Sequence, residues 1–311
     1  METRNPDRLT LIAFVLTILF AGNNAIAVKY SNAELPPFFG AAIRFTLAAI
    51  ILFIVVLIMR LQLPRGRSLL GAVIYGTLST GLNFALLYWA LEYIPAGLSM
   101  VILALVPLLT FLFAWAHRQE SFRWTALFGA LLAVIGIGII AREQLSADVP
   151  LLPMLAVVGA AACFAESSVL IKSYPQTHPI TTNAVALATG SVILFVLSAL
   201  WRETPALPTL PATWGAYAYL VVFGSVATFV LSIYVIKRWT ASASSYLFVL
   251  MPIVTVSVSA LLTNETISTA LILGAVFVLA GVYVGGIAKP DQFNRIFSGV
   301  ITQREDPCPD C

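Results

Sequence analysis

The residues whose chemistry suits a ligand lie inside long apolar stretches of the sequence. Arg44 and Glu166 are charged, and Asn23 and Asn24 carry amides. A guanidinium binds carboxylates, a carboxylate accepts hydrogen bonds from amines, and an amide both donates and accepts. These residue types are suited to binding and releasing a solute.

Hydroxyl and amide side chains also recur at helical spacing in two other apolar stretches. They are Tyr75, Ser79 and Asn83 in one stretch and Ser225, Thr228 and Ser232 in the other. Residues at this spacing share one helix face, and a polar face within lipid must meet the bundle interior or a watery cavity. We expect the two faces to line one cavity, with Ser167 and Tyr246 as further candidates. The alternative is that the serine and threonine hydroxyls bond back to their own helices.

Arg44 and Glu166 each allow two interpretations. Asn23 and Asn24 lie at a depth similar to that of Arg44, so their amide oxygens hold the guanidinium in a structural lock, or Arg44 instead anchors a substrate carboxylate. Glu166 lies within about two turns of its helix end. It couples transport to protons or binds a substrate amine, or else it extends to the nearby membrane interface.

The elements that carry these residues follow from composition. The chain has 311 residues, of which 60% are hydrophobic and 10% charged, and one soluble core cannot bury that many apolar side chains. The apolar blocks are about 20 residues long, the length of a helix that crosses a bilayer. We expect ten spans, near 9–28, 37–59, 68–91, 96–116, 123–141, 150–172, 180–201, 211–236, 241–262 and 267–288.

The distribution of basic residues predicts the orientation of these spans. Lys and Arg are retained on the cytoplasmic side of short loops. With the N-terminus inside, thirteen basic residues fall in inner segments and three, Lys29, Arg142 and Arg202, in outer loops, while Arg44 lies within a span. An even number of spans places both termini in the cytoplasm. We therefore expect a multi-pass protein of the inner (plasma) membrane.

An internal repeat indicates how the spans are organised. A shift of 145 residues aligns Pro107 with Pro252, Gly129 with Gly274 and Gly136 with Gly281 without a gap. Five spans per repeat is an odd number, so the second copy enters the membrane from the opposite side, as in many secondary transporters. The two prolines fall near mid-span, where each is a hinge candidate or a fixed kink. The glycine stripes predict close helix packing, or else a subunit interface.

The residues of this repeat also carry a family resemblance. Residues 105–110, 118–122 and 127–136, their echoes at 250–254, 264–268 and 273–281, and the segment Pro37–Phe45 resemble the EamA family of the drug/metabolite transporter superfamily. The resemblance implies export of amino acids, related metabolites or drugs by alternating access. The loop His117-Arg118-Gln119-Glu120 departs from the family pattern, which commonly has a small glycine-containing turn before the glutamate.

These observations combine into one expectation. The chain is an all-α membrane protein of ten transmembrane helices in two inverted five-helix repeats, with a cytoplasmic tail at 1–8, a first EamA-like repeat at 9–141, a second at 150–288 and a cytoplasmic tail at 289–311. We expect a secondary transporter that exports small metabolites such as amino acids. The alternative is efflux of lipophilic drugs, which Tyr88, Trp89, Tyr93, Tyr234 and Tyr246 would favour.

The sequence lacks the residues that other classes of function require. The only histidines are His117 and His178, in separate loops, so we do not expect an enzyme, and no phosphate-binding loop of an ATP-driven pump is present. We expect no cofactor, no bound metal and no nucleic-acid partner; the net charge of +3 suits anionic lipid. The partners expected are the bilayer and a small-molecule substrate, for a monomer or homodimer. Cys308 and Cys311 form half of a zinc site at most, and a disordered tail is the better interpretation.

Overall fold

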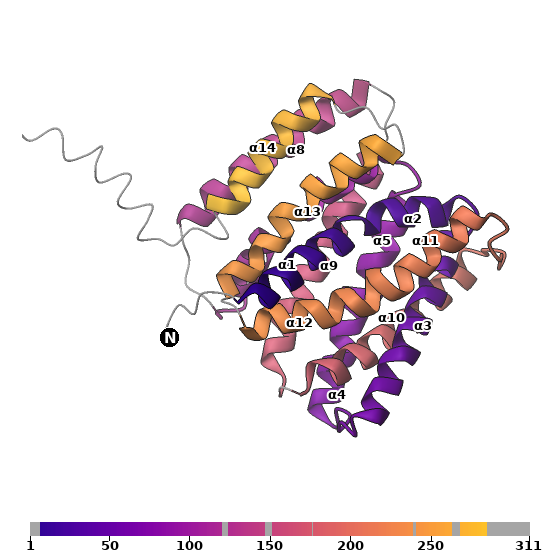
Figure 1. Cartoon of the computed structure of the whole chain (residues 1–311). Helices are drawn as coiled ribbons and strands as arrows, with labels where there is room; N and C mark the ends of the chain where they lie inside the picture. The colour runs from indigo at the N-terminus through magenta and orange to yellow at the C-terminus, as the bar shows by residue number, and fades with distance from the viewer. Residues whose placement is uncertain are drawn as a thin grey trace, which may run out of the picture.

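The computed structural model describes residues 7–119, 124–146, 151–175, 177–238, 241–262 and 268–284. Within these ranges all regular secondary structure is helical (Figure 1). Seven segments are long and apolar enough to cross a membrane, judged by length and composition. They are Arg8–Asn32, Pro37–Ile58, Arg67–Ala90, Ala96–Ala116, Leu151–Ser173, Pro179–Leu200 and Pro211–Ser232.

Four of these segments are built from more than one helix. They contain α1 (Arg8–Gly22) with α2 (Asn24–Asn32), α4 (Arg67–Gly76) with α5 (Asn83–Ala90), α6 (Ala96–Leu103) with α7 (Val106–Ala116), and α11 (Pro211–Val221) with α12 (Thr228–Arg238). The other helices are α3 (Pro37–Ile58), α8 (Trp124–Ser146), α9 (Leu151–Leu170) followed by the 3₁₀ turn η2 (Ile171–Ser173), α10 (Pro179–Leu200), α13 (Ala241–Leu262) and α14 (Thr269–Val282). Cys308, Cys311 and the expected C-terminal tail lie outside the described residues.

Two of the composite segments contain a π-helical stretch at matching positions of the repeat. The stretch η1 (Thr77–Leu82) joins α4 to α5, and η3 (Val222–Ala227) joins α11 to α12. A shift of 145 residues superimposes the two ranges. A π turn breaks the regular hydrogen-bond ladder of an α-helix and is often found at functional sites. The two halves therefore share a backbone irregularity as well as a sequence pattern.

The helices α3 and α10 pack extensively against each other, and they are equivalent under a shift of 142 residues. Each begins with proline at its first position, where proline is well tolerated, and has 22 residues. Each is followed by an arginine with positive φ, 51° at Arg60 and 55° at Arg202. Phe38 at the start of α3 contacts Trp201 after the end of α10, at a ring-centroid distance of 5.7 Å. The two helices therefore pack antiparallel.

The helices α8 and α14 carry the glycine stripes and lie together at one edge of the bundle (Figure 1). A methyl group at Gly136 would lie 2.6 Å from the carbonyl oxygen of Gly274, and one at Gly281 would collide with the carbonyl oxygen of Gly129. The backbones thus approach too closely for any larger side chain. The glycine stripe of α8 packs directly against that of α14, which is the close helix packing that the sequence predicts.

Two glutamates join the halves at one end of the molecule, which we call the Glu34 end. Glu34, between α2 and α3, accepts hydrogen bonds from the backbone N–H groups of Thr209 and Leu210 at the start of α11. Glu203, between α10 and α11, accepts hydrogen bonds from the N–H groups of Phe38 and Phe39, at 3.1 and 2.8 Å. Each half therefore supplies a carboxylate to a helix N-terminus of the other, where negative charge is favourable.

The surface of the bundle is apolar, as contact with lipid requires. Large side chains such as Leu57, Ile58 and Leu200 are more than 70% exposed, and many others on α3, α8 and α10 are exposed as well. In water these side chains would favour association or aggregation. Facing hydrocarbon, they place the helices in a membrane.

Candidate functional site

Arg44 lies about two turns after the start of α3, and only 1% of its surface is exposed. Its Nη1 donates to the Tyr88 hydroxyl at 2.9 Å, its Nε to Ser225 Oγ at 3.1 Å and its Nη2 to the carbonyl oxygen of Gly224 at 3.2 Å. The guanidinium carbon also lies 4.9 Å from the centre of the Phe45 ring. The partners come from both halves of the chain, so Arg44 is a contact between the halves as well as a buried charge.

The π-helical stretch η3 supplies two of these partners. Its irregular ladder presents the carbonyl oxygen of Gly224, which also accepts a hydrogen bond from Asn24 Nδ2 at 3.2 Å. Only glycine fits at this position. A methyl group there would collide with Asn24 Oδ1 and lie 3.1 Å from Arg44 Nη2. The backbone of η3, the amide of Asn24 and the guanidinium therefore meet at one point.

The two asparagines do not form the expected lock on Arg44. Asn23 Nδ2 donates to the carbonyl oxygen of Leu19 at 2.9 Å, and Asn24 Nδ2 donates to Gly224. The Oδ1 atoms of both residues are buried and have no hydrogen-bond partner within the described part of the chain. Asn23 is the single residue between α1 and α2. The unused oxygen of Asn24 lies beside Gly224, as does the buried guanidinium.

Within the described residues, no acidic side chain pairs with Arg44. Its hydrogen bonds use three of the five N–H groups that a guanidinium offers. Burying a charge is costly unless another group compensates it. The tyrosine, the serine, the carbonyl and the aromatic rings of Phe45 and Phe84 provide partial compensation. A bound anion would complete it.

The polar stripes of the third and eighth spans cross the π-helical stretches, with Ser79 on η1 and Ser225 on η3. Ser79 Oγ donates to the carbonyl oxygen of Tyr75 and Asn83 Nδ2 to that of Ser79, at 2.7 and 3.0 Å. Thr228 Oγ1 donates to Phe223. The hydroxyls of Ser79 and Thr228 therefore bond back to their own segments, which is the alternative to lining a cavity. Among the described residues no hydrogen bond joins the first stripe to the second, so the site in hand is centred on Arg44 and Ser225.

The remaining cavity candidates are not gathered at Arg44. Ser167 is buried and its hydroxyl donates to the carbonyl oxygen of Phe164 at 2.7 Å. Ser232 is half-buried on α12. The side chain of Tyr246 lies outside the described part of the structure. These three residues remain sequence predictions.

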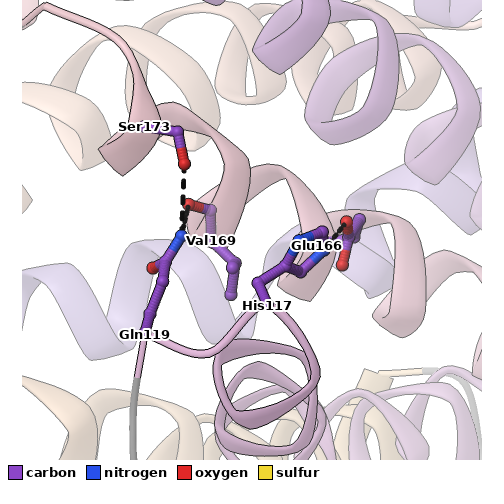
Figure 2. Close-up of polar contacts among 5 residues, drawn as sticks. All are labelled: His117, Gln119, Glu166, Val169 and Ser173. Atoms are coloured by element: carbon purple, nitrogen blue, oxygen red, sulfur yellow. Dashed lines mark hydrogen bonds and ion pairs between the residues drawn. The ribbon is translucent and has the colours of Figure 1, made fainter.

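Glu166 forms a second polar cluster at the opposite end of the molecule from Glu34, which we call the His117 end. Its Oε1 lies 2.7 Å from His117 Nε2, and Gln119 Nε2 donates to the carbonyl oxygen of Val169 and to Ser173 Oγ, both at 3.2 Å (Figure 2). His117 follows α7, whereas Glu166 is near the end of α9. The carboxylate thus contacts a histidine of the other half, a partner that the sequence did not suggest; proton coupling, binding of a substrate amine and extension to the membrane interface stay predictions for Glu166.

The two hinge candidates differ in their local structure. Pro107 is at the start of α7, directly after the break at residues 104–105. Pro252 is inside α13, which is continuous from Ala241 to Leu262. The first proline therefore accompanies an interruption of its span, while the second is accommodated within a helix. The hinge role of both remains a prediction.

Sequence reasoning missed several partners in these clusters. The sequence indicates Tyr88 only as an aromatic residue and His117 only as a loop histidine, and it gives no indication for Gly224. A hydroxyl within a span was the available signal for Tyr88. The Gly224 carbonyl carries no side-chain signal, because the π turn that presents it cannot be derived from hydrophobic periodicity.

Membrane-length apolar helices, discontinuous spans and a buried polar site between two halves define a polytopic membrane transporter. Comparison with known proteins makes this specific. A model of the EamA-like transporter family matches the chain twice, over residues 8–142 and 151–285. The chain belongs to the EamA-like transporter family.

Relatives of the chain carry transporter names. It is 27% identical to the uncharacterized transporter YyaM of Bacillus subtilis, with 89% of this chain and 93% of the relative covered. It is 27% identical to the uncharacterized inner membrane transporter YedA of Escherichia coli, over 82% and 83% of the two chains. A probable amino-acid metabolite efflux pump of Salmonella typhimurium is 26% identical over 87% and 92%. A solved crystal structure shares the fold, with a TM-score of 0.63 at 18% identity over 93% of this chain and 98% of the other.

Proposed function

We propose that this protein exports small amino-acid-like metabolites by alternating access, and that Arg44 binds the carboxylate of the substrate. The main observation behind the proposal is that the Arg44 guanidinium, of which only 1% is exposed, has no acidic partner within the described residues. A carboxylate fits the remaining N–H groups and makes charge-assisted hydrogen bonds with them. The name of the Salmonella relative, a probable amino-acid metabolite efflux pump, supports the same class of substrate.

The side-chain oxygens of Asn23 and Asn24 offer hydrogen-bond acceptors for a second group of the substrate. Asn24 Oδ1 and Arg44 Nη2 both lie beside Gly224, and the Oδ1 atoms of Asn23 and Asn24 are buried without donors. An ammonium or amine group supplies the donors that these oxygens lack. A compound with a carboxylate and an amine a few bonds apart therefore satisfies both sets of atoms. Because Arg44 is fully buried, binding and release require the halves to separate on alternate sides.

We further propose the arrangement expected from the sequence: ten spans in two inverted repeats at 9–141 and 150–288, with both termini in the cytoplasm of an inner-membrane protein. The antiparallel packing of α3 on α10 supports it, as does the reciprocal contact of Gly136 with Gly274 and of Gly281 with Gly129. The bias in basic residues assigns the His117 end to the cytoplasm and the Glu34 end to the outside.

A second candidate function is efflux of lipophilic drugs or other toxic compounds. The rings of Phe45 and Phe84 lie 4.9 and 5.6 Å from the Arg44 guanidinium carbon, and aromatic faces suit flat apolar ligands. Arg44 would then be a structural residue of the contact between halves. The two functions predict different substrates for the same site.

One experiment separates these functions. A strain that overexpresses the protein is grown on a panel of toxic amino-acid analogues and lipophilic drugs, with efflux of labelled compounds measured in parallel. We expect resistance to, and efflux of, compounds with a free carboxylate. Protection against lipophilic drugs alone, with amino-acid analogues unaffected, would overturn the proposal in favour of the second function.

A further inference from the structure

The His117 end contains a contact between the halves that the substrate site does not use. After α7, His117 contacts Glu166 near the end of α9, and Gln119 contacts Val169 on α9 and Ser173 in η2 (Figure 2). Arg118 between them has φ 57°, a left-handed conformation that ends α7 and turns the chain. The contact joins residues 117–119 of the first family match to residues 166–173 of the second. It therefore spans the boundary that alternating access must open at this end.

This contact has a titratable part and a part that does not titrate. His117 and Glu166 are 40% and 24% exposed in their side chains, so protons reach them from the adjoining water. Gln119 makes two hydrogen bonds across the same boundary but carries no charge at any pH. Histidine is the side chain that changes charge near neutral pH. An imidazolium makes a stronger, charge-assisted hydrogen bond to a carboxylate than a neutral imidazole does.

The elements packed against α7 and α9 carry other ionisable residues. They are Cys163 on α9, Lys172 in η2, Arg67 and Tyr75 on α4 and Tyr88 on α5, with Arg118 directly after α7 and Tyr174 directly after η2. Within the described part of the chain, His117 and Glu166 form an ion pair only with each other. The ionisable side chains of α8 and α13, which also contact α7, lie outside that part.

We propose that His117 and Glu166 form a proton-binding latch, in which a proton taken up by the imidazole strengthens the closure of the His117 end. The proton arrives from the water at this end and returns to it when the latch opens. The latch therefore regulates opening by the pH on one side and supplies no driving force. It rests on the alternating access of the proposed function, but not on any particular substrate.

The test uses Cys163 as a reporter of opening. Cys163 is half-buried on α9 one turn before Glu166, so it shares that face of the helix. With Cys308 and Cys311 replaced by serine, its labelling by a water-soluble maleimide is followed in liposomes at about pH 6 and about pH 8. Labelling needs no substrate, so its outcome is separate from that of the export assay. Each variant is compared with the parent at the same pH, because thiol reactivity itself depends on pH.

We expect His117→Gln and Glu166→Gln to raise the labelling rate about two- to fivefold at pH 6, and less at pH 8, as for a partly exposed ion pair. Gln119→Ala should raise it by a similar factor at both pH values. His178→Gln, which removes the other histidine, should behave as the parent. Size-exclusion profiles check that each variant is folded. The deciding quantity is the labelling rate of His117→Gln divided by that of the parent. A value of one, or the same value at both pH values, would overturn the latch.

Discussion

At the scale of single residues, the site is organised around a buried charge. The sequence identified Arg44, because a charge inside an apolar stretch is costly and therefore informative. It did not identify the partners. The expected pairing with Asn23 and Asn24 rested on depth alone, whereas the structure shows the guanidinium hydrogen-bonded to Tyr88, Ser225 and the Gly224 carbonyl. Depth along a helix does not specify which helix face or which backbone carbonyl is near.

Gly224 provides the sharpest test of this geometry. Gly224→Ala places a methyl group against Asn24 Oδ1 and 3.1 Å from Arg44 Nη2, so the guanidinium must move. We expect a loss of about 1–3 kcal/mol in stability from overpacking, together with loss of export. Gly215→Ala is the matched control, because a methyl group at Gly215 on the same span meets no atom within 4 Å. Thermal unfolding and efflux assays of both variants test this expectation. Equal stability and equal export in the two variants would contradict the described contacts.

At the scale of helices, the length of the apolar blocks predicts where the spans lie but not where they are interrupted. The expected spans at 37–59 and 180–201 correspond closely to α3 and α10. The π-helical stretches η1 and η3 were missed, because the polar stripes at Tyr75–Asn83 and Ser225–Ser232 were assigned on a regular 3.6-residue repeat. In η3 the hydroxyls of Ser225 and Thr228 instead donate five residues back, to Leu220 and Phe223.

The carboxylate caps at the Glu34 end make a prediction about pH. Hydrogen bonds from the side chains of Thr209 and Thr213 and the N–H groups of Leu210 and Thr209 lower the pKa of Glu34 from 4.5 to about 2. A lowered folded-state pKa means that the charged carboxylate stabilises the protein above about pH 4.5, and that this contribution is lost as the pH falls toward 2. We expect Glu34→Gln to lower the Tm at neutral pH, and the difference from the parent to shrink below pH 4.5. A difference that does not change with pH would contradict the charged cap.

Glu92, at the same end, serves as a control because its pKa is shifted in the opposite direction from that of Glu34. Burial and the nearby charge of Glu203 raise its pKa, so its charged form is disfavoured in the folded protein and opposes folding increasingly as the pH rises. Glu92→Gln should therefore leave the Tm unchanged or raise it at neutral pH. If Glu92→Gln and Glu34→Gln lowered the Tm equally in thermal scans, general damage to the loops would be the better explanation.

At the scale of the whole molecule, the repeat was readable from the sequence, while the contacts between its halves were not. Equal spacing of Pro107 and Pro252, or of Gly129 and Gly274, reports common ancestry of segments. It does not report that Glu34 caps α11 or that Glu203 caps α3, because these contacts join residues more than 160 positions apart. Such pairings depend on how the finished helices pack.

The orientation of the halves is tested by reporter fusions. Fusions after Arg67 and Lys237 should report the cytoplasm, and fusions near Ser146 and Glu203 should report the periplasm, because basic residues are retained inside. A reversed pattern would refute the assignment of the His117 end to the cytoplasm. A mixed pattern would refute the inverted arrangement of the two repeats.

The account's central claim is that Arg44 recognises a carboxylate, and transport selectivity tests it most directly. In proteoliposomes, flux of an exported amino acid is compared with flux of its methyl ester, for the parent, Arg44→Lys and Arg44→Gln. Charged hydrogen bonds contribute about 1.5–3 kcal/mol, so we expect the parent to prefer the acid by about tenfold or more. Arg44→Lys should keep part of this preference, since lysine lacks the bidentate geometry, and Arg44→Gln should lose it. An Arg44→Gln protein that is folded and retains the parent's preference for the acid would contradict the claim.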